Sequence, residues 1–255
     1  MFTGGNAQDP SRPVSRWLLV NPRSGDGSGI DELCAAAAAR GIDTHVLRPG
    51  EDAATLAREA HADVLGASGG DGTMAAVAGA ALERGLPFVC IPFGTRNHFA
   101  RDLGLDRSEP EAALDAFDGA ERRIDVGRAN GRLFLNNVSI GAYAVLVHHG
   151  WRRVLDAVRL RQRLTVDDET IHTRVLLVAN NAYSFSGARK QLDEGRLHVY
   201  TPGGEIRVAE RVDVGARTER IGVAIDGERA ELATPAHFEI EPRALRLLLP
   251  SGPGA

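Results

Sequence analysis

Residues 63–85 have the sequence DVLGASGGDGTMAAVAGAALERG, and this stretch decides the fold. Residues 63–67 form a short apolar run that predicts a buried strand, and residues 73–83 have the pattern of a helix. Gly69-Gly70-Asp71-Gly72-Thr73 lies between them. Glycine lets backbone N–H groups approach an anion closely, and the start of the following helix adds positive potential. The stretch therefore predicts a phosphate-binding loop between a strand and a helix.

The alternation of strand and helix patterns extends to both sides of this loop. Strands are expected at residues 17–20, 44–47 and 88–91, and helices at about residues 31–40 and 52–60. Strands separated by helices indicate a parallel sheet with helices on both of its faces. We therefore expect an α/β fold for the first half of the chain.

The second half has a different pattern. Short strand-like runs, one of them over residues 206–214, are separated by turn residues such as Asp226-Gly227. Many short strands with regular turns indicate an antiparallel sandwich or barrel. We expect a disordered arm at residues 1–15, an α/β nucleotide-binding domain over residues 16–124, and a β-rich domain over residues 125–255 that completes an active site between the two domains.

The composition narrows the class of protein. A chain that is 43% hydrophobic and 25% charged is ordinary for a soluble globular protein, and a net charge of −4 argues against a dedicated nucleic-acid binder. Cys34 and Cys90 lie in apolar segments and are expected to be reduced, which suits a cytoplasmic protein. No stretch approaches the roughly 20 apolar residues of a membrane span, so membrane contact is expected to be peripheral.

Three glycine-containing loops each follow an expected strand on the same side of the parallel sheet. They are residues 21–29, 68–73 and 92–97. Ligands of open α/β sheets bind outside the carboxyl ends of the strands, where such loops gather. Thr73 and Thr95 add hydroxyl donors. Tight turns alone would explain one such loop, but three at equivalent positions favour a phosphate site.

Asp71 is unexpected in this loop, because a carboxylate repels a phosphate. A divalent cation or a ribose hydroxyl bound to Asp71 would resolve the conflict. The loop also differs from two common nucleotide motifs, because it has neither the Gly-x-Gly-x-x-Gly dinucleotide pattern nor the Walker pattern Gly-x4-Gly-Lys-Ser/Thr.

The three loops resemble the signature loops of the diacylglycerol kinase catalytic-domain family. This family includes bacterial lipid kinases and sphingosine kinases and is distantly related to NAD kinases. The matching segments are VNPRSG at residues 20–25, GGDGT at 69–73, PFGTRNHFAR at 92–101, LDEGRL at 192–197, IDGE at 225–228 and PRAL at 242–245. The motifs occur in the same order as in the family and cover roughly residues 16–250.

The resemblance implies a two-domain kinase that transfers the γ-phosphoryl group of ATP, with Mg²⁺, to an alcohol in the cleft between its domains. A lipid such as diacylglycerol is the first candidate acceptor. Asp226 would act as the general base, and Glu228 nearby would support a metal or orientation; an Asp-Gly hairpin turn is the structural alternative for Asp226-Gly227. The nucleotide contacts implied are Asn21, Ser24, Gly25, Gly69, Gly70, Asp71, Gly72, Thr73, Thr95 and Asn97.

The sequence departs from the family pattern at two positions. His98 stands where bacterial lipid kinases usually have Asp, and it could pair with Asp71 or Asp226, bind a substrate phosphate, or have only a packing role. Glu194 replaces the Asp of the family's Asp-Gly-x-Leu turn. In relatives this carboxylate holds a structural Mg²⁺ together with neighbouring carbonyl groups, which implies Gln191, Glu194 and Arg196 as the metal site here.

Other interpretations of the acceptor and of the activity stay open. The acceptor could be a soluble alcohol or NAD, although Asn136-Asn137 stands where NAD kinases usually have an Asn-Glu pair. The change at His98 would also suit a nucleotide-binding protein without catalysis. Arginines at and after an expected helix over residues 151–161 could face an anionic membrane, but a solvated helix face is the simpler interpretation. These arginines are Arg152, Arg153, Arg159, Arg161 and Arg163.

Overall fold

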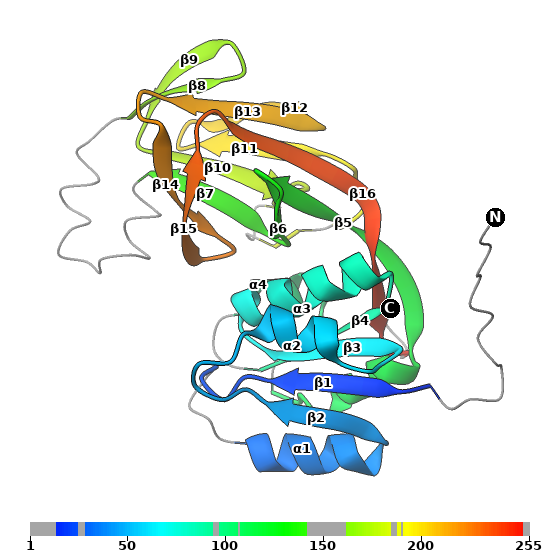
Figure 1. Ribbon diagram of the computed structural model, residues 1–255. Helices are drawn as coiled ribbons and strands as arrows, with labels where there is room; N and C mark the ends of the chain where they lie inside the picture. The colour runs from blue at the N-terminus through cyan, green and yellow to red at the C-terminus, as the bar shows by residue number, and fades with distance from the viewer. Residues whose placement is uncertain are drawn as a thin grey trace, which may run out of the picture.

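The structure is a computed structural model that describes residues 14–24, 29–93, 97–106, 108–141, 162–184, 188–189 and 191–251. Gly25, Thr95 and the expected helix over residues 151–161 lie outside the described residues. Figure 1 shows two domains, one above the other, and the helices of the described residues all lie in the lower domain. Within the described part of the chain, no helix is long and apolar enough to cross a membrane.

The lower domain is built on a parallel sheet in the order β2-β1-β3-β4. Its central strands β3 and β4 are buried along their whole length, as expected for a sheet covered on both faces. The sheet strands are β1 (Arg16–Val20), β2 (Ile42–Val46), β3 (Val64–Gly69) and β4 (Phe88–Pro92).

Helices cover both faces of this sheet. α2, α3 and α4 share one hydrophobic core with the sheet, and α1 and the 3-10 helix η1 share another on the opposite face. The five helices are α1 (Ile30–Ala39), α2 (Ala53–Glu59), α3 (Asp71–Arg84), α4 (His98–Asp102) and η1 (Ala112–Asp118). In Figure 1 the α2, α3 and α4 layer faces the upper domain.

The upper domain is β-rich, which confirms the expected fold class of an α/β domain followed by an antiparallel β domain. Six of its strands form an antiparallel sheet in the order β12-β11-β10-β7-β14-β15. The strands are β5 (Ala120–Ala129), β6 (Arg132–Phe134), β7 (Asn137–Gly141), β8 (Gln162–Val166), β9 (Glu169–Thr173), β10 (Val175–Asn180), β11 (Leu197–Thr201), β12 (Gly204–Ala209), β13 (Arg211–Ala216), β14 (Arg220–Ile225), β15 (Glu228–Ala233) and β16 (Ala236–Leu249).

The single strand expected over residues 206–214 is wrong, because the chain changes sheets there. β12 pairs with β11 in the six-stranded sheet, whereas β13 pairs with β16 and β8 in the other sheet. Both segments have β-forming sequences, and only their different partners separate them.

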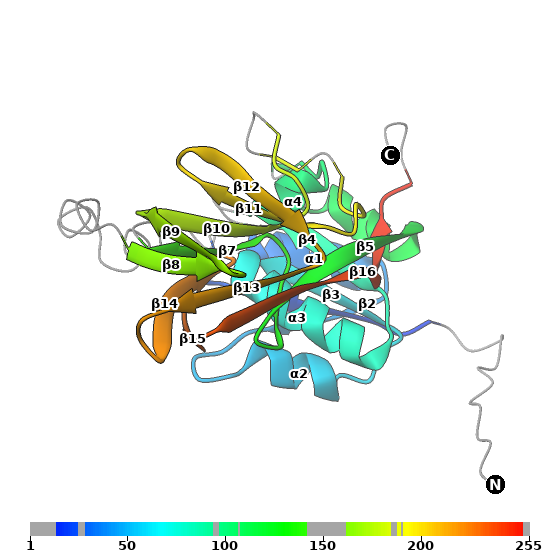
Figure 2. The ribbon, with the colours of Figure 1, turned by 90° about the horizontal axis from the view of Figure 1, so that it is seen from above.

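Two long strands, β5 and β16, connect the domains. They pair antiparallel from Phe238 opposite Ala129 to Leu249 opposite Ala120, with an irregularity between Glu241 and Leu245. The end of β16 also pairs in parallel with β4, so the last strand returns to the sheet of the first domain. Figures 1 and 2 show β5 and β16 side by side along this path. The boundary between residues 124 and 125 stays a prediction, since a continuous ladder crosses it.

We predict that Gly66→Ala lowers the free energy of unfolding by about 1–3 kcal/mol, because a core position here has no room for another carbon atom. A Cβ atom at Gly66 would lie 2.5 Å from Cζ of Phe117, which packs on the sheet from η1. Urea unfolding monitored by circular dichroism measures the change.

Gly222→Ala is the matched control, because Gly222 also lies in a strand but has open space at its Cβ position. It should be neutral or stabilise the protein by about 0.5–1 kcal/mol. Equal effects of the two substitutions would contradict the packing of η1 on β3.

Candidate active site

The three loops predicted to gather at the sheet edge are hydrogen-bonded to one another. Nδ2 of Asn21 donates to Oγ1 of Thr73 at 2.8 Å, and the backbone N–H of Gly70 donates to Oγ of Ser24 at 2.9 Å. Nδ2 of Asn97 donates to the carbonyl of Gly69 at 2.9 Å. The ends of β1, β3 and β4 therefore form one surface around the start of α3.

Asp71 is buried at the first position of α3 and accepts hydrogen bonds through both of its oxygens. Oδ1 accepts from the backbone N–H of Phe99 at 3.1 Å and from Nδ2 of Asn136 at 3.3 Å. Oδ2 accepts from the backbone N–H of His98 at 3.2 Å and lies 3.0 Å from Nδ1 of the His98 ring. These donors satisfy the hydrogen-bonding needs of the buried carboxylate, and the binding of a cation or a ribose hydroxyl to Asp71 stays a prediction.

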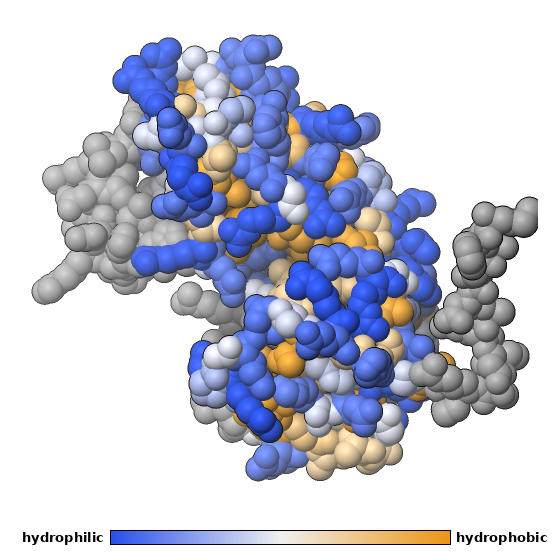
Figure 3. Space-filling view, in the orientation of Figure 1, coloured by the Kyte–Doolittle hydropathy of each residue, from blue (hydrophilic) through white to orange (hydrophobic). Residues whose placement is uncertain are grey.

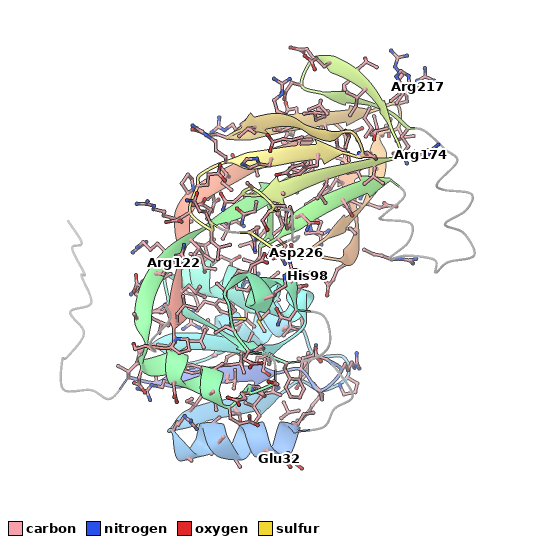
Figure 4. All side chains as sticks on the ribbon, turned by 180° about the vertical axis from the view of Figure 1, so that it is seen from behind. Glu32, His98, Arg122, Arg174, Arg217 and Asp226 are labelled. Atoms are coloured by element: carbon pink, nitrogen blue, oxygen red, sulfur yellow. The ribbon has the colours of Figure 1, made fainter. Side chains whose placement is uncertain are left out.

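His98 therefore pairs with Asp71, one of the two partners considered from the sequence. Its side chain is 51% exposed, so the ring is not packed in the core and faces the space between the domains. Figure 4 shows His98 and Asp226 near each other in this space.

Asp226 occupies the tight turn between β14 and β15. Ile225 pairs with Glu228, so Asp226 and Gly227 are the two loop residues of a hairpin, and both have positive φ angles of 47° and 83°. This conformation is that of a type I′ turn, which Asp-Gly favours. The hairpin interpretation of Asp226-Gly227 is thus confirmed, and it places the Asp226 carboxylate in the cleft.

Three backbone N–H groups hold the Asp226 carboxylate. Leu135 donates to Oδ2 at 2.7 Å, and Asn136 and Asn137 donate to Oδ1 at 2.7 Å and 3.1 Å. Burial raises the pKa of Asp226 to about 6, because desolvation outweighs the lowering effect of these donors, and the Asp71 charge adds to the increase. A buried carboxyl group in a cleft with such a pKa is a candidate functional group.

Glu228 reaches across the cleft to the start of α3. A Cβ atom built on Gly72 would lie 1.6 Å from Oε1 of Glu228, so a larger residue at this position would require the Glu228 side chain to move. The absence of a side chain at Gly72 leaves this space free. It lets a carboxylate of the second domain lie against the first turn of α3.

Two cavities meet at Asp226. The larger has a volume of about 460 Å³ and lies between α2 and α3 on one side and β5, β6, β14 and β15 on the other. The smaller, of about 220 Å³, is lined by Asp71, His98, Asn136, Asn137, Val175, Leu177, Asp226 and Gly227. In Figure 3 hydrophobic residues are visible where the two domains meet above α3, on a face that is mostly hydrophilic.

Comparison with known proteins identifies the first domain. Residues 15–129 match the model of the diacylglycerol kinase catalytic domain. Over these residues the chain is similar to this family. The resemblance that the glycine loops indicated is thereby confirmed for the first domain.

The similar proteins are lipid kinases or diacylglycerol kinases by name. A probable lipid kinase YegS-like of Pseudomonas aeruginosa is 41% identical over 128 residues, which cover 46% of this chain and 42% of the relative. A diacylglycerol kinase of Bacillus subtilis is 37% identical over 111 residues, 41% of this chain and 37% of the relative. The chain thus spans about two fifths of the length of these curated relatives.

The fold similarity extends over both domains. The crystal structure of a diacylglycerol kinase from Bacillus anthracis superposes with a TM-score of 0.70 at 21% identity. The match covers 94% of this chain and 97% of the other. At this identity it shows a shared architecture, including the β-rich domain that the family model does not reach.

The structural metal site expected at Gln191, Glu194 and Arg196 stays a prediction. Oε2 of Glu194 accepts the backbone N–H of Ala182 at 3.2 Å and lies 3.2 Å from Nε2 of His198, so this carboxylate already has protein partners. The carbonyl of Arg196 accepts the backbone N–H of Asn181 at 3.0 Å, and Gln191 is exposed. Across the described ranges, no three His, Cys, Asp or Glu side chains form a group that could hold a metal ion.

Three residues around the two carboxylates were not predicted as site residues from the sequence. Asn136 donates a hydrogen bond to Asp71. Asp102 and Arg189 form a buried ion pair beside Asn136. The sequence draws attention to Asn136 only as part of Asn136-Asn137, which stands where NAD kinases usually have an Asn-Glu pair. Asp102 and Arg189 are 87 residues apart, and no motif links them, so only the folded chain brings them together.

We predict that Asp71→Asn lowers the free energy of unfolding by about 1–3 kcal/mol while the protein stays folded, and abolishes phosphoryl transfer. The substitution replaces one carboxylate oxygen by an NH2 group, which then faces the backbone N–H of either His98 or Phe99 and cannot accept a hydrogen bond from it. Urea unfolding and a transfer assay measure the two effects.

Asp168→Asn is the control, because Asp168 lies exposed in the turn between β8 and β9. Its effect on stability should stay within about 0.5 kcal/mol, with normal transfer. Near-normal turnover of folded Asp71→Asn protein would remove Asp71 from the mechanism.

Proposed function

We propose that this protein transfers the γ-phosphoryl group of ATP to the hydroxyl group of a lipid-like alcohol, with Asp226 as the general base. The observation that carries the proposal is that two cavities of different character meet at the Asp226 carboxylate. One lies beside the glycine loop and suits the nucleotide, and the other suits the acceptor. The names of the relatives support a kinase of this type.

The larger cavity suits the nucleotide because α3 presents small residues to it. Gly72, Ala75, Ala76 and Gly79 form this wall. Side chains of this size leave a smooth surface on which a planar base and a ribose can lie. Arg58, Arg128 and Arg132 also border the cavity. Arg58 is paired with Glu83 and Arg128 with Glu241, so Arg132 is the arginine best placed to bind a phosphate-bearing ligand.

The smaller cavity suits an alcohol with an apolar body. Val175 and Leu177 of β10 form its apolar wall, and the polar wall contains Asp71, His98 and Asp226. An acceptor that lies against Val175 and Leu177 would direct its hydroxyl group to the carboxylates. A soluble acceptor such as NAD would leave this apolar wall without a matching group.

Asp226 has the properties that a general base for an alcohol requires. The three N–H donors of residues 135–137 fix the direction of its carboxylate. Its pKa of about 6 is closer to pH 7 than that of an ordinary aspartate, which suits a general base. When an acceptor hydroxyl attacks the γ-phosphorus atom, its proton passes to Asp226 and the bond between the γ-phosphorus and the bridging oxygen of ADP breaks.

A divalent cation fits best at Glu228. Both oxygens of Asp71 already accept N–H groups, whereas no hydrogen bond or ion pair engages the Glu228 carboxylate among the residues that the structure describes. Glu228 lies against Gly72 at the start of α3, where the triphosphate would bind. Mg²⁺ bound there with ATP would neutralise charge on the phosphate oxygens.

The pH dependence of the reaction should report Asp226. Because the base acts in its ionised form and burial raises its pKa to about 6, we expect log kcat/KM to rise with pH up to about 6 and then to level off. Initial rates with ATP and a lipid acceptor between pH 5 and 8 measure this. His98→Asn should keep the same break, and a flat profile would contradict the assignment of Asp226.

The acceptor can be tested with γ-labelled ATP, Mg²⁺ and a panel of alcohols. We expect label in lipid alcohols presented in micelles or vesicles, with diacylglycerol first, and not in NAD. Asp226→Asn should lower kcat by about 10²–10⁴-fold, the usual effect of removing a general base. Leu177→Asp should raise KM for the lipid more than KM for ATP, because Leu177 lines only the smaller cavity.

Asp167→Asn is a matched control for Asp226→Asn. Asp167 also has a positive φ, 51°, in a two-residue hairpin turn, but it pairs with Arg207 away from the cleft. It should leave the rate unchanged. Label in NAD alone would overturn the lipid assignment. ATP binding without transfer to any acceptor would favour a nucleotide-binding protein without catalysis.

A further inference from the structure

A buried arginine lies between the two domains. The Arg189 side chain is 1% exposed, and its Nε donates to Oδ2 of Asp102 at 2.7 Å; the Asp102 carboxylate is fully buried. Arg189 belongs to the segment that follows β10, and Asp102 is the last residue of α4 in the first domain. The ion pair therefore joins the second domain to the helix whose first N–H groups bind Asp71.

The other guanidinium nitrogens of Arg189 bind the segment that carries the N–H donors of Asp226. Nη1 donates to the carbonyls of Leu135 at 2.6 Å and Asn180 at 3.0 Å. Nη2 donates to Oδ1 of Asn136 at 2.8 Å. The planar guanidinium group of Arg189 thus binds four acceptors. Two lie in the connection between β6 and β7, one lies at the end of β10, and the fourth is the Asp102 carboxylate of α4.

The bond from Arg189 sets the direction of the Asn136 amide. Since Oδ1 of Asn136 accepts from Arg189, its Nδ2 must point the other way, and it donates to Oδ1 of Asp71 at 3.3 Å. The backbone N–H of the same residue donates to Asp226. Asn136 therefore contacts both Asp71 and Asp226, and Arg189 binds the Asn136 side chain on the side away from Asp71.

The energetics of such a pair favour a positioning role. A buried ion pair gains little net stability over apolar residues of similar volume, because both charges lose their hydration. Its fixed geometry instead specifies how the groups around it are arranged. Arginine is suited to this role because its donors form a rigid planar fork and it stays charged at all relevant pH values.

We propose that Arg189 is a positioning residue, which aligns Asp71 and Asp226 for catalysis through Asn136 and holds the two domains together through Asp102. It touches neither cavity. The inference rests on the proposed function for its catalytic consequence, whereas the contact between Arg189 and Asn136 can be tested without any activity.

The first test compares Arg189→Lys with the unsubstituted protein. Lysine keeps the charge beside Asp102, so the protein should fold, but one ammonium group cannot replace a fork that binds four acceptors. We expect kcat to fall about 10²-fold, as expected when reacting groups are misplaced by about 1 Å, while KM for ATP changes less than about threefold. A loss of ATP affinity with unchanged kcat would overturn the proposal.

Arg84→Lys is the matched control. Arg84 also donates through both Nη atoms to backbone carbonyls, those of Ala57, Ala60 and Ala62, but these bonds join α2 to α3 and reach no carboxylate. If Arg84→Lys lowers kcat as much as Arg189→Lys, the effect of Arg189 is general destabilisation and the proposal fails.

A double substitution tests whether Arg189 acts through Asn136. If it does, Arg189→Lys combined with Asn136→Ala should be no slower than the slower single variant, because both remove the same link. If the decrease in log kcat of the double variant equals the sum of the decreases in the two single variants, Arg189 does not act through Asn136 and the proposal is overturned.

The nuclear magnetic resonance signal of the Asn136 side-chain amide gives a readout that does not depend on activity. This signal is assigned as the one that is missing from the spectrum of the Asn136→Ala variant. The chemical shift of the Asn136 signal should change in Arg189→Lys and stay the same in Arg84→Lys. An unmoved signal would overturn the contact. Absence of phosphoryl transfer in the unsubstituted protein, with the expected shift, would instead overturn the proposed function alone.

Discussion

Two carboxylates, Asp71 and Asp226, are buried where the domains meet, and each requires hydrogen-bond donors because an unpaired charge away from water is costly. The donors come from elements that are distant in the sequence. The start of α4 and Asn136 serve Asp71, and the backbone of residues 135–137 serves Asp226. Satisfying the two carboxylates therefore fixes α3, α4, β7 and the β14–β15 turn relative to one another.

The long β5–β16 ladder makes this arrangement possible. Because it continues from the second domain into the sheet of the first, it limits how far the domains can rotate apart. The ladder is irregular between Glu241 and Leu245, and another buried carboxylate, Asp125, supports this point. Its oxygens accept the backbone N–H groups of Arg243 at 2.7 Å and Gly195 at 2.6 Å.

The cleft also shows how one residue can serve both local structure and chemistry. Asp226 has the left-handed conformation of a hairpin loop, which Asp tolerates better than most residues, and the same turn directs its carboxylate into the cleft. Gly72 acts in a comparable way, since it belongs to the glycine loop and also leaves room for Glu228 of the other domain. For these residues a structural explanation and a functional one hold together.

The sequence by itself determined the α/β domain, its three loops and the family of that domain, because these depend on strand and helix periodicity and on short contiguous motifs. It also determined the Asp226-Gly227 turn, whose conformation depends on two adjacent residues. Only the tertiary structure decided the division of residues 206–214 between two sheets, the return of β16 to the first domain, and the pairing of Arg189 with Asp102. These features depend on which distant segments meet, and the same local sequence is compatible with several partners until burial of the core and pairing of the buried charges select one.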